Sequence, residues 1–154
     1  MYIIFQYLSK KSLIAEVEDL TNKIVEIKKQ NQAILDNSPV CTKIIDLDYN
    51  LQFMSASGVR DLDIDDITEF YGKPYPLEFY PQSFKDIMIA GLDKCKETGE
   101  IITQEAPVVD LNRNTMWFHS TITPIDDNEG NLDYFLVVSY DITKFKVNEK
   151  ISNG

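Results

Sequence analysis

The chain has 154 residues, 44% of them apolar, which is enough for one hydrophobic core with appended segments but too little for two ordinary domains. It carries 25 acidic and 15 basic residues, for a net charge of −10 at pH 7. Such a chain lacks the surplus of Lys and Arg that neutralises nucleic-acid phosphates, so we expect no nucleic-acid partner. Residues 36–143 hold twenty of the acids and seven of the bases, which predicts one acidic globular domain between two nearly balanced ends.

Cys41 and Cys95 are the two cysteines, and neither lies in a CxxC pair or at a spacing typical of zinc ligands. Cysteine use of this kind is typical of a reducing compartment, so we expect a cytoplasmic protein. Residues 1–11 begin with an apolar run that breaks at Ser9, and no later run approaches the roughly 20 residues that span a membrane. We therefore expect no signal peptide and no membrane span, and treat residues 1–11 as a separate apolar segment that could contact a partner.

Residues 12–36 show apolar residues at alternating steps of four and three, the pattern of a heptad seam. One seam position is a single Asn, and the a positions are otherwise β-branched, which favours a parallel two-stranded coiled coil and therefore a homodimer. The alternative is an amphipathic helix that packs on its own domain, since Lys23 and Lys28 would repel each other across a dimer. The predicted dimerisation residues are Leu13, Val17, Leu20, Ile24, Ile27, Asn31 and Ile34.

After this helix the chain alternates between strand-like and helical segments. Pro39 ends the helix, because proline disfavours helical geometry in the residue before it. Strands are expected first as a hairpin and later as a block of three, with helical segments between them, one of which ends at Gly99. The expected strands are 42–46, 51–54, 101–109, 115–124 and 132–142, and the expected helices are 58–70 and 82–98. Strands and helices in separate blocks predict an α+β fold, a five-stranded antiparallel sheet with helices on one face.

Several short motifs in this order resemble the PAS domain, a sensory module of bacterial and archaeal signalling proteins. They are Asn37-Ser38-Pro39, a Trp117 strand closed by Thr123-Pro124-Ile125, the turn Asp-Asp-Asn-Glu-Gly at 126–130, and Asp141-Ile142-Thr143. The resemblance covers about residues 32–146. It implies a PAS-like sensory domain at 37–143, a pocket between the sheet and the helix of Phe84, and the start of an output helix or tail at 144–154. It departs from the family at Ser55-Ala56-Ser57, where an Asn usually ties the second strand to the next helix.

The resemblance also implies which strand residues face a pocket. In ligand-binding members, the matching positions are Phe118, Ser120, Ile122, Phe135, Val137 and Ser139, and they share one face of their strands by alternation. This mostly apolar set with two hydroxyls suits a small organic ligand. The alternative is a packed core with two satisfied serines. Trp117, Tyr134 and Leu136 fall on the other face, which we expect to be covered by the first helix or by a second protomer.

The same comparison leaves the cofactor unknown. Flavin-photoadduct members carry their cysteine in an Asn-Cys-Arg-Phe-Leu-Gln run, whereas Cys95 lies in Asp-Lys-Cys-Lys-Glu. Haem-binding members supply a His from the helix before the third strand, but the only His of this chain is His119, on a strand. The acidic run 61–66 lacks the Gly and the closing Glu of a calcium loop, so we expect a solvated helix start there and no metal.

The residues Asp141, Ile142 and Thr143 stand where the last strand gives way to a helix. A carboxylate and a hydroxyl at this place can accept backbone N–H groups at the helix start, as an N-cap does. The resemblance adds that this is the junction through which PAS domains pass a signal to the next helix.

No constellation of catalytic residues is present in the sequence, so we expect that the chain is not an enzyme. Our main hypothesis is a non-catalytic input module, in which ligand binding shifts the flanking helices of a homodimer and so acts on an effector domain or a separate signalling protein. The alternative is a dimerisation module with a filled core and no ligand.

Overall fold

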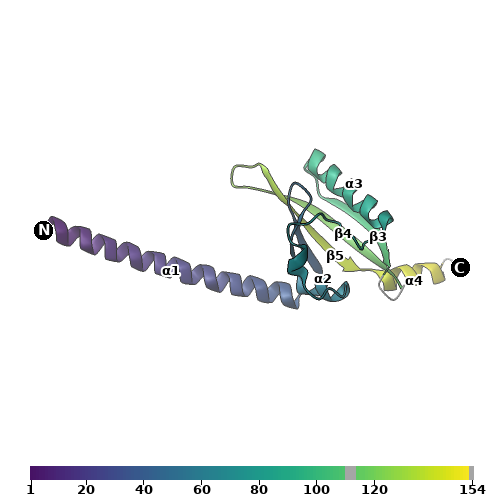
Figure 1. Cartoon of the computed structure of the whole chain (residues 1–154), viewed down its shortest axis with the longest axis horizontal. Coiled ribbons are helices and arrows are strands. Elements are labelled where there is room, and N and C mark those ends of the chain that lie inside the picture. The colour runs from purple at the N-terminus through teal and green to yellow at the C-terminus, as the bar shows by residue number, and fades with distance from the viewer. Residues whose placement is uncertain (110–113, 153–154) are drawn as a thin grey trace. The chain divides into compact units, whose positions relative to one another are not determined.

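The computed structural model describes residues 1–109 and 114–152 and divides the chain into two compact units, Met1–Asn37 and Ser38–Gly154. The first unit is one continuous helix, α1 (Tyr2–Asn37), none of whose residues is buried (Figure 1). The helix predicted at 12–36 therefore begins ten residues earlier and includes the apolar segment 1–11. The physical reason is that residues 1–11 contain no Pro or Gly, so nothing in them interrupts a helix that has already formed.

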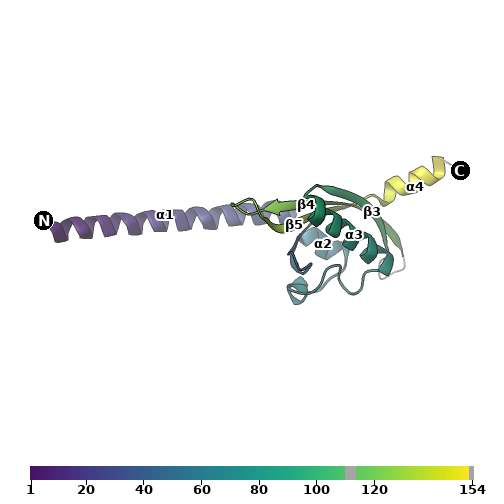
Figure 2. The same cartoon turned by 90° about the horizontal axis from the view of Figure 1, so that it is seen from above.

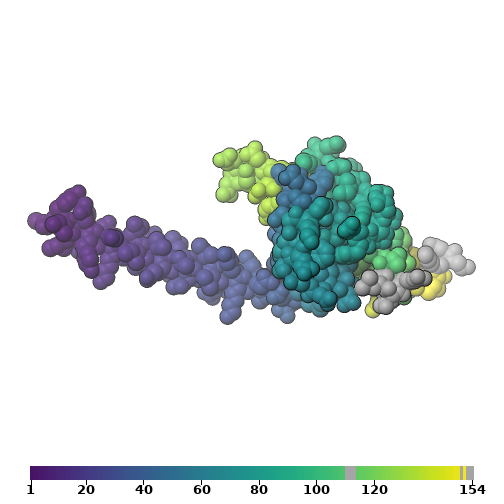
Figure 3. All heavy atoms as spheres, viewed as in Figure 1, coloured from purple at the N-terminus to yellow at the C-terminus, as the bar shows by residue number. Residues whose placement is uncertain are grey.

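The second unit is built on a five-stranded antiparallel sheet in the order β2-β1-β5-β4-β3. Three helices follow β2 in the chain and precede β3 (Figure 2). Their atoms make up much of the face seen in Figure 3. The strands are β1 (Cys41–Ile45), β2 (Leu51–Met54), β3 (Ile102–Val109), β4 (Thr115–Asp126) and β5 (Leu132–Asp141). The helices are α2 (Ala56–Asp61), the 3₁₀ helix η1 (Ile67–Phe70), α3 (Gln82–Thr98) and α4 (Thr143–Ser152). The predicted α+β fold is confirmed.

Side-chain alternation explains how the sheet buries one face. Along β1, β4 and β5 every second residue is buried, because successive side chains of a strand point to opposite faces. Helix α3 covers this face with residues spaced three or four apart, among them Phe84, Met88 and Leu92, and ends at Gly99 in the left-handed conformation. The core therefore lies between the sheet and α3, as the pattern predicts.

The segment predicted as a helix over 58–70 is helical only at its two ends. Helix α2 stops at Asp61 and η1 begins at Ile67, and the residues between them form a loop. Asp66 explains the break, because its carboxylate accepts the Thr68 N–H and caps η1. Short acidic side chains compete for backbone N–H groups in this way, so an Asp-rich run favours caps over a continuous helix.

A pair of serines replaces the Asn that the resemblance led us to expect after β2. Ser57 Oγ donates to the carbonyl of Val40 at 2.6 Å, and Ser55 Oγ accepts the N–H of Thr42 at 2.9 Å. Both serines are buried, so these hydrogen bonds are shielded from water. The serines therefore connect the start of α2 to the chain around the start of β1. In the part of the chain that the structure describes, no helix is long and apolar enough to span a membrane.

Gly58 of α2 lies against the start of β1 without room for a side chain. A Cβ at this position would stand 2.2 Å from Cys41 Sγ and 3.0 Å from Met54 Cγ. We expect Gly58→Ala to lower the free energy of unfolding by roughly 1–3 kcal/mol, the usual cost of overpacking a core. Urea denaturation measures this. In a Cys41→Ala background the same substitution should cost less than half as much, and an equal cost in both backgrounds would contradict the packing argument.

Candidate functional site

An interior cavity lies between the inward face of the sheet and the helices α2 and α3. Its volume is about 20 Å³, and β1, β4 and β5 contribute to its floor. Its described lining combines apolar side chains with a few polar ones: Cys41, Lys43, Gly58, Asp61, Leu62, Tyr80, Phe84, Val108, Phe118 and Ser139. A cavity of this size has room for one water or one small polar group.

All six residues predicted to face a pocket are buried on the inward face of β4 and β5. Phe118 and Ser139 line the interior cavity. The remaining four, Ser120, Ile122, Phe135 and Val137, are not part of its described lining. Ser120 pairs with Ser139, and Ile122 pairs with Val137, while Phe135 packs in the core beside them. The structure thus brings the set together on one face, but only part of it reaches the open space.

Sequence reasoning missed Lys43, which is 3% exposed and lies in the middle of β1. Its ammonium donates to Ser139 Oγ at 3.2 Å, and Ser139 Oγ shares a 2.8 Å hydrogen bond with Ser120 Oγ. The register explains the contact, because β1 and β4 both pair with β5 at this level of the sheet. The available signal was alternation, since Cys41, Lys43 and Ile45 occupy the same face of one strand.

Burial affects the titratable groups around this cavity in different ways. Burial alone lowers the pKa of Lys43, but the neighbouring Cys41 and Asp61 oppose it and the net shift is upward, so Lys43 is a cation at neutral pH. Burial raises the pKa values of Tyr75 and Tyr80 well above the ordinary phenol value, so both phenols are neutral. The Tyr75 hydroxyl lies near Tyr80, yet it makes no hydrogen bond of normal geometry within the described residues.

A larger cleft of about 520 Å³ adjoins the interior cavity and shares Asp61, Leu62, Val108 and Phe118 with it. Apolar side chains such as Phe70, Phe79 and Met116 contribute to its walls. The acidic residues of the run 61–66, whose sequence does not match a calcium loop, also line the cleft. Over residues 1–109 and 114–152, no group of three His, Cys, Asp or Glu is placed to hold a metal ion.

The junction residues predicted at the end of β5 form a compact hydrogen-bond network with β4. Asp141 Oδ1 accepts the Thr143 N–H at 2.7 Å and also the Thr143 hydroxyl. Thr143 Oγ1 in turn accepts the Trp117 N–H at 2.9 Å, and the Ile142 N–H donates to the Trp117 carbonyl at 2.7 Å. Both backbone polar groups of Trp117, its N–H and its carbonyl, are therefore hydrogen-bonded to the start of α4.

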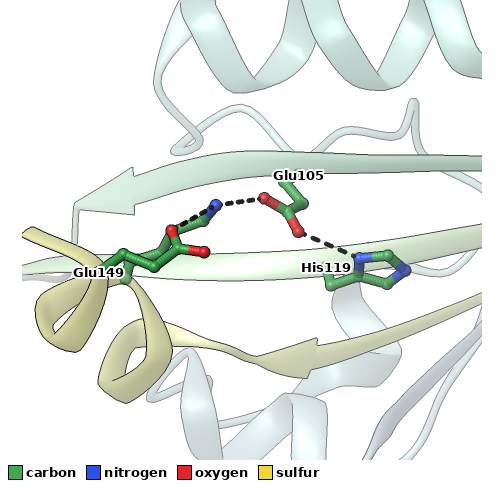
Figure 4. A network of polar contacts seen from close by, with 4 residues as sticks. Glu105, His119 and Glu149 are labelled. Atoms are coloured by element: carbon green, nitrogen blue, oxygen red, sulfur yellow. Dashed lines mark hydrogen bonds and ion pairs between the residues drawn. The ribbon is translucent and has the colours of Figure 1, made fainter. Parts of the chain in front are cut away.

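A second set of contacts joins α4 to the outer face of the sheet. Lys146 of α4 lies 2.7 Å from Glu105 Oε2 of β3 and 3.5 Å from Glu149. Figure 4 shows the Glu105 carboxylate also directed toward His119, with Nδ1 at 3.5 Å. The Lys146 ammonium lies 5.6 Å from the centre of the Trp117 ring, a cation–π distance. His119 thus takes part in a surface network of polar contacts, and α4 covers part of the outer face near Trp117.

The hydroxyl of Thr143 gives the first test of this junction. Thr143→Val keeps the shape of the side chain but leaves the Trp117 N–H without its acceptor and removes one of the two hydrogen bonds to Asp141 Oδ1, so we expect roughly 1–3 kcal/mol less stability. Hydrogen exchange of the Trp117 amide should become faster by the factor that corresponds to this free energy, about tenfold for each 1.4 kcal/mol. Thr143→Ser keeps the hydroxyl and serves as the control, and equal exchange rates in the two variants would contradict the assignment.

The ion pair of Lys146 with Glu105 predicts how the docking of α4 depends on pH. Lys146 holds the pKa of the Glu105 carboxyl below its ordinary value of 4.5, so the contact is complete above pH 4.5 and is lost as the pH falls through the lowered value. Trp117 is the only Trp and reports this directly by fluorescence. We expect an emission change in acid while the far-UV circular dichroism stays native. Glu105→Gln should show the acid-state emission already at pH 7, and an unchanged pH profile would count against the ion pair.

Comparison with known proteins agrees with this geometry. The sequence matches the family described as PAS fold over residues 35–147. The PAS domain of a Colwellia psychrerythraea protein is similar in structure, at 17% identity and a TM-score of 0.64, over 77% of this chain and 98% of that one. The PAS domain of an HTR-like protein from Haloarcula marismortui is similar at 19% identity and a TM-score of 0.65, over 81% and 99% of the two chains.

The fold similarity extends to VqmA bound to DPO, at 12% identity and a TM-score of 0.64, over 73% of this chain and 57% of that one. No curated protein matches the sequence. PAS domains are sensory modules of signalling proteins and are generally non-catalytic. Since the match spans most of the sequence and the sheet order and helices agree with it, this chain belongs to the PAS fold family.

Proposed function

We propose that the chain is a non-catalytic sensory input module that binds a small ligand between its sheet and its helices. The observation that carries the proposal is the interior cavity, which has polar groups in its wall and adjoins a cleft of about 520 Å³. A pocket with mostly apolar walls and a few polar groups is the usual form of a small-molecule site. The similar protein VqmA is described as bound to DPO, which supports the proposal that this chain binds a ligand.

The route from cavity to output is short in the sheet. Phe118 lines both the interior cavity and the cleft, and it is the register partner of Asp141 in the junction. The preceding residue, Trp117, is hydrogen-bonded to Thr143. A ligand that moves Phe118 would therefore act on the strand segment to which α4 is attached. We infer that residues 144–154 begin the output helix and that the domain proper spans 37–143, with an effector domain or a separate signalling protein as the recipient.

The helix α1 supplies the proposed dimer interface. Its seam residues are exposed, and none of the residues of α1 is buried. A stripe of exposed Leu, Ile and Val is costly in water unless a partner covers it. A second copy of α1 fits the heptad spacing, with Asn31 as the single polar a position that favours two parallel strands.

A second candidate function is a dimerisation module with a filled core. The small interior volume, about 20 Å³, favours it, because most of the inward face is occupied by packed side chains. Native mass spectrometry of the freshly purified chain distinguishes the two functions in one experiment. A dimer that carries a bound small molecule supports the sensor, whereas a bare dimer that takes up nothing from a metabolite panel favours the filled-core module.

The dimer seam can be tested by one charged substitution and a control on the same helix. Ile24→Asp places a carboxylate at an a position, where the partner helix would bury it. We therefore expect the dissociation constant of the dimer to rise by at least about tenfold. Val25→Asp makes the same kind of change one residue away from the seam and should leave the dimer intact. Sedimentation velocity measures both. A chain that is monomeric before any substitution, or equal effects of the two changes, would contradict the coiled coil.

A further inference from the structure

The ammonium group of Lys43 is buried without a counter-charge in contact with it. The side chain is 3% exposed, and among residues 1–109 and 114–152 the oxygen that accepts a hydrogen bond from it is Ser139 Oγ, at 3.2 Å. Within that part of the chain no carboxylate lies within 4 Å of Nζ. An ammonium has three donors, so at least one is directed at something other than an oxygen of the folded chain. Buried cations are ordinarily paired with an anion, whereas the ammonium of Lys43 contacts the side chains of Cys41 and Ser139 and no carboxylate of the described residues.

The neighbours of Lys43 do not neutralise it. Tyr75 and Tyr80 are neutral phenols, because burial raises their pKa values, and Lys43 Nζ lies 6.0 Å from the centre of the Tyr75 ring. Asp61 lines the same cavity, but it is exposed, so its charge is largely screened by water. The interior of the cavity is therefore positive, whereas its mouth is acidic.

The space beside Lys43 has the size of one small polar group. The interior cavity measures about 20 Å³, while a single water needs roughly 10–15 Å³. Through Leu62, Val108 and Phe118 it adjoins the 520 Å³ cleft, which has room for the body of a ligand. A carboxylate group is smaller than a tetrahedral phosphate, and an amine would meet the like charge of Lys43.

We propose that this cavity binds a small organic carboxylate, whose carboxylate group accepts hydrogen bonds from Lys43 Nζ and whose apolar body lies in the cleft. The inference rests on the proposed ligand-binding function and adds the chemical class of the ligand. Charge-assisted hydrogen bonds of this kind are stronger than neutral ones, and more so away from water. Ser139 holds the ammonium in place through its hydrogen bond, and Ser120 holds Ser139.

Isothermal titration calorimetry of the full chain tests the proposal with matched pairs of probes. Butyrate, benzoate and phenylacetate are each compared with their own amide, which keeps the shape and removes the charge. We expect at least one carboxylate to bind at least about tenfold more tightly than its amide. Lys43→Met keeps the length of the side chain without its charge and should weaken that carboxylate by about tenfold to a hundredfold. Lys94→Met, an exposed change on α3, is the control and should have no effect.

Two further measurements separate a ligand anchor from a structural lysine. Without any probe, Lys43→Met should unfold at a temperature close to that of the original chain, because removing a buried charge offsets the loss of its contacts with Ser139 and Cys41. Asp61→Asn removes a repelling charge from the exposed mouth of the cavity and should tighten carboxylate binding by about twofold, a small effect because water screens most of that charge. This second variant also decides the question if Lys43→Met does not fold.

The outcomes distinguish the ligand class from the function beneath it. Amides that bind as tightly as carboxylates, or carboxylate binding that survives Lys43→Met or is not tightened by Asp61→Asn, would overturn the carboxylate assignment and leave ligand binding intact. A neutral molecule retained in native mass spectrometry would do the same. If no probe binds and the native protein is bare, the proposed sensory function fails together with the inference.

Discussion

The pairing of β5 between β1 and β4 is the constraint on which the rest of the globular unit depends. Because β5 is bonded on both sides, its alternation is fixed, and Phe135, Val137 and Ser139 must all face the core. The same register brings Lys43 and Ser120 to the two sides of Ser139. Asp141 follows two residues later on the same strand, so the polar centre of the core and the start of α4 are set by a single element.

The parts of the fold that were predictable from the sequence are those with a repeating pattern. The helix at 82–98 follows from its spacing, and Gly99 marks its end by its left-handed conformation. The inward faces of the last two strands follow from alternation together with the family resemblance. The junction Asp141-Ile142-Thr143 was predictable because capping depends on neighbours in sequence. Its attachment to Trp117 was not, since that contact depends on how two strands pair.

The remaining features depend on contacts between distant parts of the chain. The loop between α2 and η1 has no period to read, and the place of α2 depends on Ser57 and Gly58 fitting against the chain around β1. Lys43 was missed because a strand lysine ordinarily lies at the surface, and only the fold closes the core over it. The residues predicted to face a pocket are all buried, while the open space depends on helix packing and, of that set, involves Phe118 and Ser139.

The thiol of Cys41 offers a way to measure how often the cavity opens. Its thiol lines the interior cavity, is buried and is not in a disulfide, and Cys95 is likewise buried and free. A thiol enclosed in this way reacts with an alkylating reagent only while the surrounding side chains are apart, so the rate of labelling measures how often the core opens there. Motions of the sensory unit can therefore be followed in the unmodified chain, through an atom that stands in the wall of its own cavity.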